Sequence, residues 1–141
     1  MTRDPEAMLR EGLDAWNRGD VEGMLELLDP DVEIHLSGAF PDLDREYHGH
    51  DGLREFWRAM TEMWHPLRMS VGEIETIDGL MLSGVTFHGT GREGIEVERE
   101  FWFVWQFDEA GEKVAAYSSH RDRESAVETA RAAVRTGSLR A

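Results

Sequence analysis

The longest uninterrupted pattern of apolar and polar positions lies between residues 95 and 107. This stretch has no Gly or Pro and is rich in β-branched and aromatic residues, which is typical of one long strand. Because successive side chains of a strand point to opposite faces, the odd positions form an apolar face whose single charge is Arg99. The even positions are first acidic and then carry Trp102 and Val104. The stretch therefore predicts a strand with a core face and with an apolar patch on its outer face.

Helical spacing of apolar residues predicts three helices before this strand and one after it. Asp4, Asp20 and Asp122 stand where N-cap residues are expected, and Pro5 follows at the first helical position. The expected helices cover about 5–17, 21–28, 51–64 and the alanine-rich segment after Asp122.

Alternating residues predict further strands at 32–36, 68–77, 80–89 and 114–119, with a brief one at 47–50. Asp78 and Gly79 give a hairpin turn signal. Helices followed by an antiparallel meander indicate an α+β fold, and the length indicates one domain over residues 1–141. We expect a curved, mostly antiparallel sheet wrapped on the N-terminal helices, with a C-terminal helix, because this arrangement buries the apolar stripes.

Charge and composition narrow the possible partners. The chain has 29 acidic and 15 basic residues, a net charge of −14, which argues against nucleic acid or an anionic membrane as a partner. It has no Cys, so disulfides and thiol chemistry are excluded. The N-terminus lacks the apolar run of a signal peptide, and we expect a cytoplasmic protein.

Three segments, 15–20, 28–32 and 47–53, resemble the SnoaL-like (polyketide-cyclase-like) family of the nuclear-transport-factor-2-like superfamily. The resemblance implies a cone-shaped α+β barrel with an apolar pocket between the concave sheet and the helices. It also implies a homodimer through the outer sheet face, which agrees with the patch at Trp102 and Val104. The superfamily contains isomerases, cyclases, epoxide hydrolases and non-catalytic binding modules, so membership alone does not specify the site or its chemistry.

The acids that relatives use for catalysis are replaced in this chain. In related cyclases the acid stands in the last strand, three residues before the Asp that starts the final helix; the matching residue here is Ser119. Related limonene epoxide hydrolases carry an Arg and, two residues later, an Asp on the long strand. This sequence has Arg99 but Phe101 in the second place. The resemblance therefore supports neither the cyclase mechanism nor the epoxide hydrolase mechanism for this chain.

Three side chains remain as catalytic candidates. Arg99 on the apolar face would anchor a ligand carboxylate, enolate or carbonyl, or would form a structural ion pair. His35 shares a strand face with Glu33 and would act as a general acid or base, or would be a surface or core histidine. Tyr117, which shares a face with Ser119, would donate a hydrogen bond to a ligand or pack in the core.

The predicted pocket would suit a flat, largely apolar ligand, with the loop at 37–46 as a lid candidate. The residues expected to line it are Trp16, Phe40, Trp57, Met60, Trp64, Phe87, Phe101, Trp105 and Ser119.

His48, His50 and Glu55 have the spacing of a cupin metal site. Cupins hold these ligands on strands, whereas Glu55 falls on a predicted helix, so we expect neither a metal nor another cofactor.

Two functions are compatible with this pattern. The first is a dimeric small-molecule-binding protein for a hydrophobic, oxygen-bearing ligand, with proton transfer or isomerisation at His35, Arg99 and Tyr117. The second is a non-catalytic binding or dimerisation module. An acid or base inside the cavity would favour the enzyme, and a cavity lined only by apolar side chains and one paired Arg would favour the module.

Overall fold

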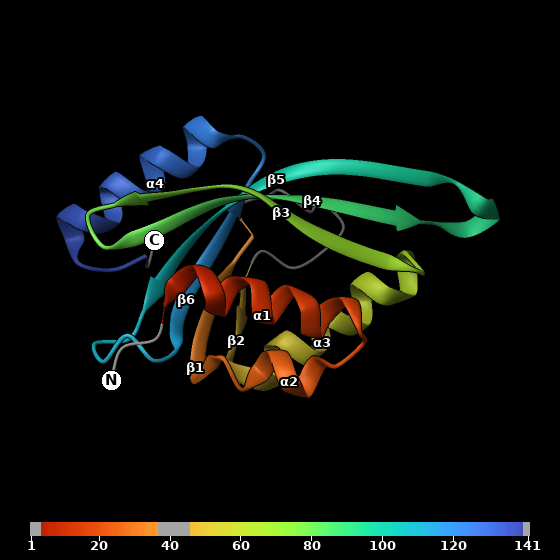
Figure 1. Cartoon of the computed structure of the whole chain (residues 1–141), viewed down its shortest axis with the longest axis horizontal. Helices are drawn as coiled ribbons and strands as arrows, with labels where there is room; N and C mark the ends of the chain where they lie inside the picture. The colour runs from red at the N-terminus through yellow and green to blue at the C-terminus, as the bar shows by residue number, and fades with distance from the viewer. Residues whose placement is uncertain (1–3, 37–45, 140–141) are drawn as a thin grey trace.

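The computed structural model describes residues 4–36 and 46–139, and it contains one curved sheet with helices on both faces (Figure 1). The helices are α1 (Pro5–Asn17), α2 (Val21–Leu25), α3 (Gly49–Met63) and α4 (Arg123–Thr136), with a short 3-10 helix at Arg92–Gly94. The strands are β1 (Leu28–His35), β2 (Glu46–His48), β3 (Leu67–Ile77), β4 (Leu80–Thr90), β5 (Glu96–Phe107) and β6 (Val114–His120). No described helix is long and apolar enough to cross a membrane.

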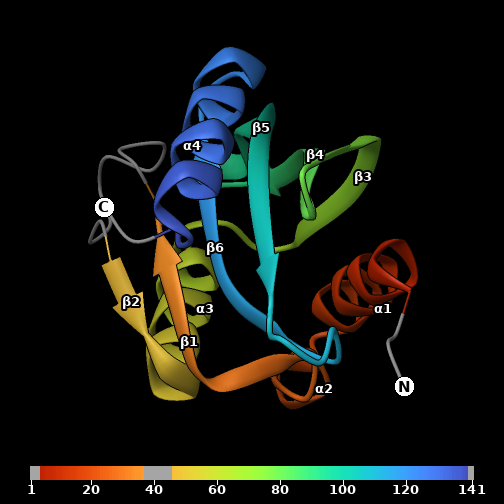
Figure 2. The same ribbon diagram turned by 90° about the vertical axis from the view of Figure 1, so that its left-hand side faces the viewer.

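The six strands follow the order β2-β1-β6-β5-β4-β3. β1 and β6 run parallel, and the other neighbours are antiparallel. The prediction of an α+β fold with a mostly antiparallel sheet is therefore confirmed, and so is the meander from β3 to β6. Helices α1, α2 and α3 lie on one side of the sheet and α4 lies on the other (Figures 1 and 2).

The inner face of the sheet forms the larger core with α1 and α3. Phe101, Phe103 and Trp105 of β5 are buried there, which confirms the predicted inward direction of the odd positions. The helices contribute apolar side chains from their predicted stripes, and these include Leu9, Leu13, Trp16, Leu53, Phe56 and Met60.

The outer face carries a second apolar cluster beneath α4. Trp102 is 6% exposed and Val104 is fully buried, and both pack with the α4 residues Ala126, Ala130 and Ala133. These two side chains were expected to form a dimer surface, and this assignment needs correction because the chain's own helix covers them. Alanines on one helix face let the helix lie close to the sheet. The homodimer itself stays a prediction.

The end of α1 is bound to the free edge of β3 by one side-chain amide. Asn17 donates from Nδ2 to the Met69 carbonyl and accepts from the Met69 N–H at Oδ1, both at 2.8 Å. An edge strand leaves such backbone groups without a partner strand. Asn17 satisfies two of them, and it thereby holds α1 against the sheet.

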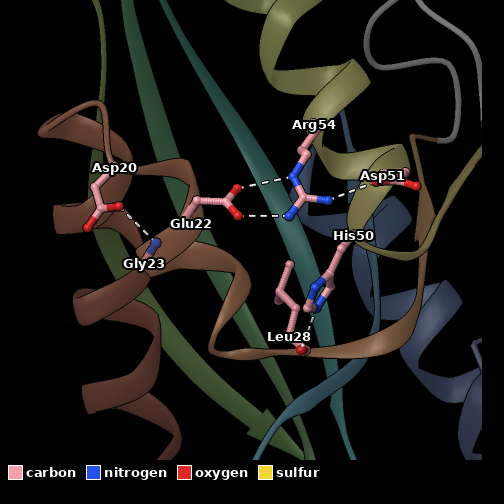
Figure 3. A network of polar contacts seen from close by, with 7 residues as sticks. All are labelled: Asp20, Glu22, Gly23, Leu28, His50, Asp51 and Arg54. Carbon is pink, nitrogen blue, oxygen red and sulfur yellow. Dashed lines mark hydrogen bonds and ion pairs between the residues drawn. The ribbon is translucent and has the colours of Figure 1, made fainter.

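The family-like segments around α2 and α3 also have structural roles (Figure 3). Asp20 caps α2 by accepting from the Gly23 N–H at 2.9 Å, as predicted. Arg54 of α3 donates two hydrogen bonds to Glu22 of α2, at 2.8 and 3.1 Å, and a third to Asp51. The guanidinium holds the pKa of the Glu22 carboxyl below its usual value. These contacts join α2 to α3.

The caps of α1 and α4 differ from each other. Asp122 caps α4 by accepting from the Ser125 N–H at 2.8 Å, as expected. The side chain of Asp4 makes no such bond at α1, so the prediction holds for the start of that helix but not for the capping contact.

Candidate functional site

Aromatic rings gather on the inner face of the sheet and on the helices opposite it. Trp16 of α1 packs edge-on against Trp57 of α3, with ring centroids 4.4 Å apart. On the sheet, Trp105 lies 4.8 Å from Tyr117 and 5.4 Å from Phe103. The structure thus brings most of the predicted lining residues to one face. Phe40 and residues 37–45 of the predicted lid lie outside the described residues.

Three aromatic residues of this cluster, Tyr47, Phe56 and Phe103, were not among the expected lining residues, although Phe56 and Phe103 lie on predicted apolar faces. Phe103 has the same odd parity as Phe101 and Trp105, so the alternation of β5 could have identified it. Phe56 lies in the apolar stripe of α3, and its ring centroid is 6.1 Å from that of Trp16.

The indole nitrogen of Trp16 is the most unusual polar atom of the cluster. Trp16 is 3% exposed, and its Nε1 is buried with no hydrogen-bond partner among the described residues. A buried indole N–H usually finds an acceptor, because an unpaired donor costs about 1–3 kcal/mol. This donor is therefore available to an acceptor that enters the cluster.

Tyr117 and Ser119 also point to the inner face, as predicted from their shared parity. Tyr117 stands opposite Trp105 and is 4% exposed, and burial raises the pKa of its hydroxyl well above the usual value. The phenol therefore stays protonated and can act as a hydrogen-bond donor. Ser119 is fully buried, and its Oγ donates to the Leu36 carbonyl at 3.3 Å.

His35 does not join this site. It stands opposite Ser118, whereas Ile34, its neighbour in β1, stands opposite the inward-facing Tyr117. Residues directly opposite each other on paired strands share a face, so His35 lies on the outer face. Its Nδ1 is 3.5 Å from Glu46 Oε1, and its Nε2 is buried with no partner in residues 4–36 or 46–139. The sequence left both faces of this strand open, and the structure separates His35 from Tyr117.

Arg99 has the predicted direction but not the predicted burial. It stands opposite Phe87 on the inner face, yet it is exposed. The hairpin of β4 and β5 extends beyond the helices (Figure 1). Arg99 lies near the start of β5, close to the turn of this hairpin. Trp64, the residue after α3, packs on β4 at Gly89. A Cβ atom added at Gly89 would lie only 3.1 Å from the Cβ atom of Trp64. The prediction that Arg99 is buried is therefore wrong. Contact of Arg99 with a ligand stays a prediction.

A polar cluster on the outer face was also missed. His120 is 2% exposed, and its Nε2 lies 2.8 Å from Ser118 Oγ while its Nδ1 lies 3.1 Å from Ser125 Oγ. Burial lowers the pKa of His120 to about 4, against a smaller opposing effect of Asp122. The neutral ring therefore links β6 to α4, and the alternation of residues 117–120 was its only signal in the sequence.

The three residues with cupin-like spacing differ in their exposure and contacts. His48 and Glu55 are exposed, and the Nε2 of His50 lies 3.0 Å from the Leu28 carbonyl oxygen (Figure 3). Among the described residues, no group of three or more His, Cys, Asp or Glu side chains could hold a metal ion.

The cavities lined by described residues include two that border α1. A small apolar one of about 30 Å³ lies between α1 and the sheet, next to Leu13 and Trp105. A larger open groove of about 740 Å³ lies between α1 and β3, and Leu13 borders it as well.

Comparison with known proteins gives a consistent picture of the fold. Residues 9–117 match the SnoaL-like domain family. An NTF2-like protein of unknown function from Burkholderia pseudomallei K96243 is 26% identical, with a TM-score of 0.72, over 87% of this chain and 94% of that one. No curated protein matches.

Two further solved structures are similar in fold. TerC, co-crystallised with polyporic acid, has a TM-score of 0.73 and 19% identity over 87% of this chain and 95% of its own. SalBIII is described as an epoxide hydrolase/cyclase-like enzyme in pyran ring formation in the polyether salinomycin. It has a TM-score of 0.69 and 14% identity over 84% of this chain and 91% of its own.

Proposed function

Because the chain belongs to the SnoaL-like domain family, we propose that the inner face of its sheet binds a small, hydrophobic, oxygen-bearing molecule. The observation that carries the proposal is the buried Nε1 of Trp16, which has no partner in the part of the chain that the structure describes. A ligand carbonyl or ether oxygen would accept a hydrogen bond from it and remove the cost of the unpaired donor. The surrounding rings would contact the apolar body of the ligand, and the half-buried Trp57 and Trp64 mark the side from which it would enter.

The ligands and reactions of relatives agree with this class of molecule. TerC was crystallised with polyporic acid, and SalBIII is associated with pyran ring formation. In this chain the protonated phenol of Tyr117 would be a second donor on the same face. A donor that reaches the carbonyl oxygen of the ligand would stabilise the negative charge that develops there during enolisation or cyclisation.

One observation favours the alternative, a module that binds without catalysing. Among the described residues, Tyr47 and Tyr117 are the only ionisable members of the buried inner cluster. Neither a carboxylate nor an imidazole belongs to it, and these are the usual general bases near neutral pH. Binding is therefore the primary proposal, and catalysis is a separate test.

Prodan, a neutral and environment-sensitive naphthyl ketone, is a suitable probe for binding. We expect saturable binding with a blue-shifted emission, because the probe leaves water. Trp16→Phe keeps a ring but removes the N–H, and the affinity should fall about 3- to 10-fold for one lost hydrogen bond. Trp102→Phe is the matched control, since Trp102 lies beneath α4 on the other face. Equal binding by Trp16→Phe and the unmodified chain would contradict the proposal.

Exchange of the α-protons of bound prodan in D₂O separates the enzyme from the module. An enzyme that stabilises an enolate should accelerate deuterium incorporation above the buffer rate, and Tyr117→Phe should slow it. Incorporation at the buffer rate, together with saturable binding, would support the non-catalytic module.

A further inference from the structure

The groove between α1 and β3 has a different chemistry from the rest of this acidic protein. Among the described residues, its ionisable lining consists of the basic residues Arg10, Arg68 and His88 and one carboxylate, Asp14. The whole chain, in contrast, has 29 acidic and 15 basic residues. A basic hollow on such a chain is complementary to a negatively charged ligand group.

Arg68 is the least engaged of these basic groups. It is exposed and makes no hydrogen bond or ion pair among the described residues. Arg10 is paired with Glu6 at 3.0 Å, and His88 lies 3.4 Å from Glu98, with all four side chains about half exposed or more. Exposed pairs of this kind contribute only about 0–1 kcal/mol, so a ligand anion can replace either acid at little cost.

The floor of the groove is apolar. Leu13 and Met69 are 6% and 7% exposed, and Val71 packs beside them at the edge of the inner core. The volume of about 740 Å³ is in the range of small-molecule sites. A ligand here would therefore present an apolar body to the floor and a negative group to the rim.

The free edge of β3 adds a backbone donor. Met69 uses both its N–H and its carbonyl for Asn17 instead of β4, so its backbone polar groups face the open edge. In an antiparallel pair, residues two apart have the same hydrogen-bonding direction. The N–H of Val71, which stands opposite Val85 in the same register, therefore also faces the groove.

We propose that this groove binds a small organic anion with an apolar body, and that Arg68 and the Val71 N–H bind its carboxylate. The groove includes neither Trp16 nor Tyr117, so the proposal does not depend on a ligand at the inner face. Guanidinium is suited to this role because its planar donors match the two oxygens of a carboxylate.

The test uses 2-naphthoate as the probe and its neutral amide, 2-naphthamide, as the comparison. Binding is followed by titration of the amide resonances of the full chain at low and at physiological salt. We expect saturable shifts at Leu13 and Val71, about tenfold weaker binding of the amide, and weaker binding of the anion at high salt.

Arg68→Gln should weaken 2-naphthoate binding about tenfold, since charge-assisted hydrogen bonds are the strong ones, and should leave 2-naphthamide unaffected. Arg58→Gln, a substitution of an exposed arginine on α3 outside the groove, is the matched control and should change neither affinity. Equal binding of the anion by Arg68→Gln and the unmodified chain would overturn the proposal. So would shifts confined to Trp16 and Tyr117, a result that would instead support binding at the inner face.

Discussion

The single asparagine of the chain, Asn17, allows a direct test of how α1 is held to the sheet. Its amide makes two hydrogen bonds of 2.8 Å with the backbone of Met69, one as donor and one as acceptor. Asn17→Ala removes both and leaves the Met69 groups at a partly covered strand edge. At roughly 0.5–1.5 kcal/mol for each bond, the expected loss is about 2 kcal/mol in the free energy of unfolding.

Urea denaturation followed by Trp fluorescence measures this loss as a lower midpoint at an unchanged slope. Hydrogen exchange gives a local reading, because the Met69 amide should lose protection while amides in the middle of β5 follow only the global stability. Asn17→Asp keeps the acceptor for the Met69 N–H but loses the donor to the Met69 carbonyl, so it separates the two bonds.

Arg18→Ala is the control at the neighbouring position, where the side chain makes an exposed ion pair with Asp20 at 3.6 Å. It should change stability by no more than about 0.5 kcal/mol. A loss below about 0.5 kcal/mol for Asn17→Ala, or unchanged protection of the Met69 amide, would show that apolar packing alone holds α1 in place.

Two further predictions concern the outer face. Val104 is fully buried beneath α4, so Val104→Ala should lower the free energy of unfolding by about 2–3 kcal/mol, as measured by urea denaturation. Ile95 is 60% exposed, so the control Ile95→Ala should change this free energy by less than about 0.5 kcal/mol. Burial lowers the pKa of His120 from 6.5 to about 4, so His120 binds a proton more readily in the unfolded chain than in the folded one. The free energy of unfolding should therefore fall as the pH drops from about 6.5 to about 4. His120→Gln should flatten that part of the stability curve, and an unchanged slope between these pH values would contradict the assignment to His120.

Several features could be predicted because they depend on local geometry. The direction of every second side chain along β5 follows from the geometry of a single strand, so the inward positions of Phe101 and Trp105 were readable from the sequence. The same is true of the cap at Asp20, where donor and acceptor are only three residues apart. The segments that resemble the SnoaL-like family further indicated the arrangement of the helices and strands.

The tertiary structure decided what covers each face. Val104 looked like a free outer surface, and the helix that covers it starts at Arg123, beyond a turn and a further strand. Arg99 was expected to be buried on the apolar face of β5, but it is exposed. The face of His35 depended on the register between β1 and β6, two strands far apart in the chain. Alternation specifies which side chains share a face, whereas burial depends on the segments that pack there, and such long-range contacts leave no periodic signal in the sequence.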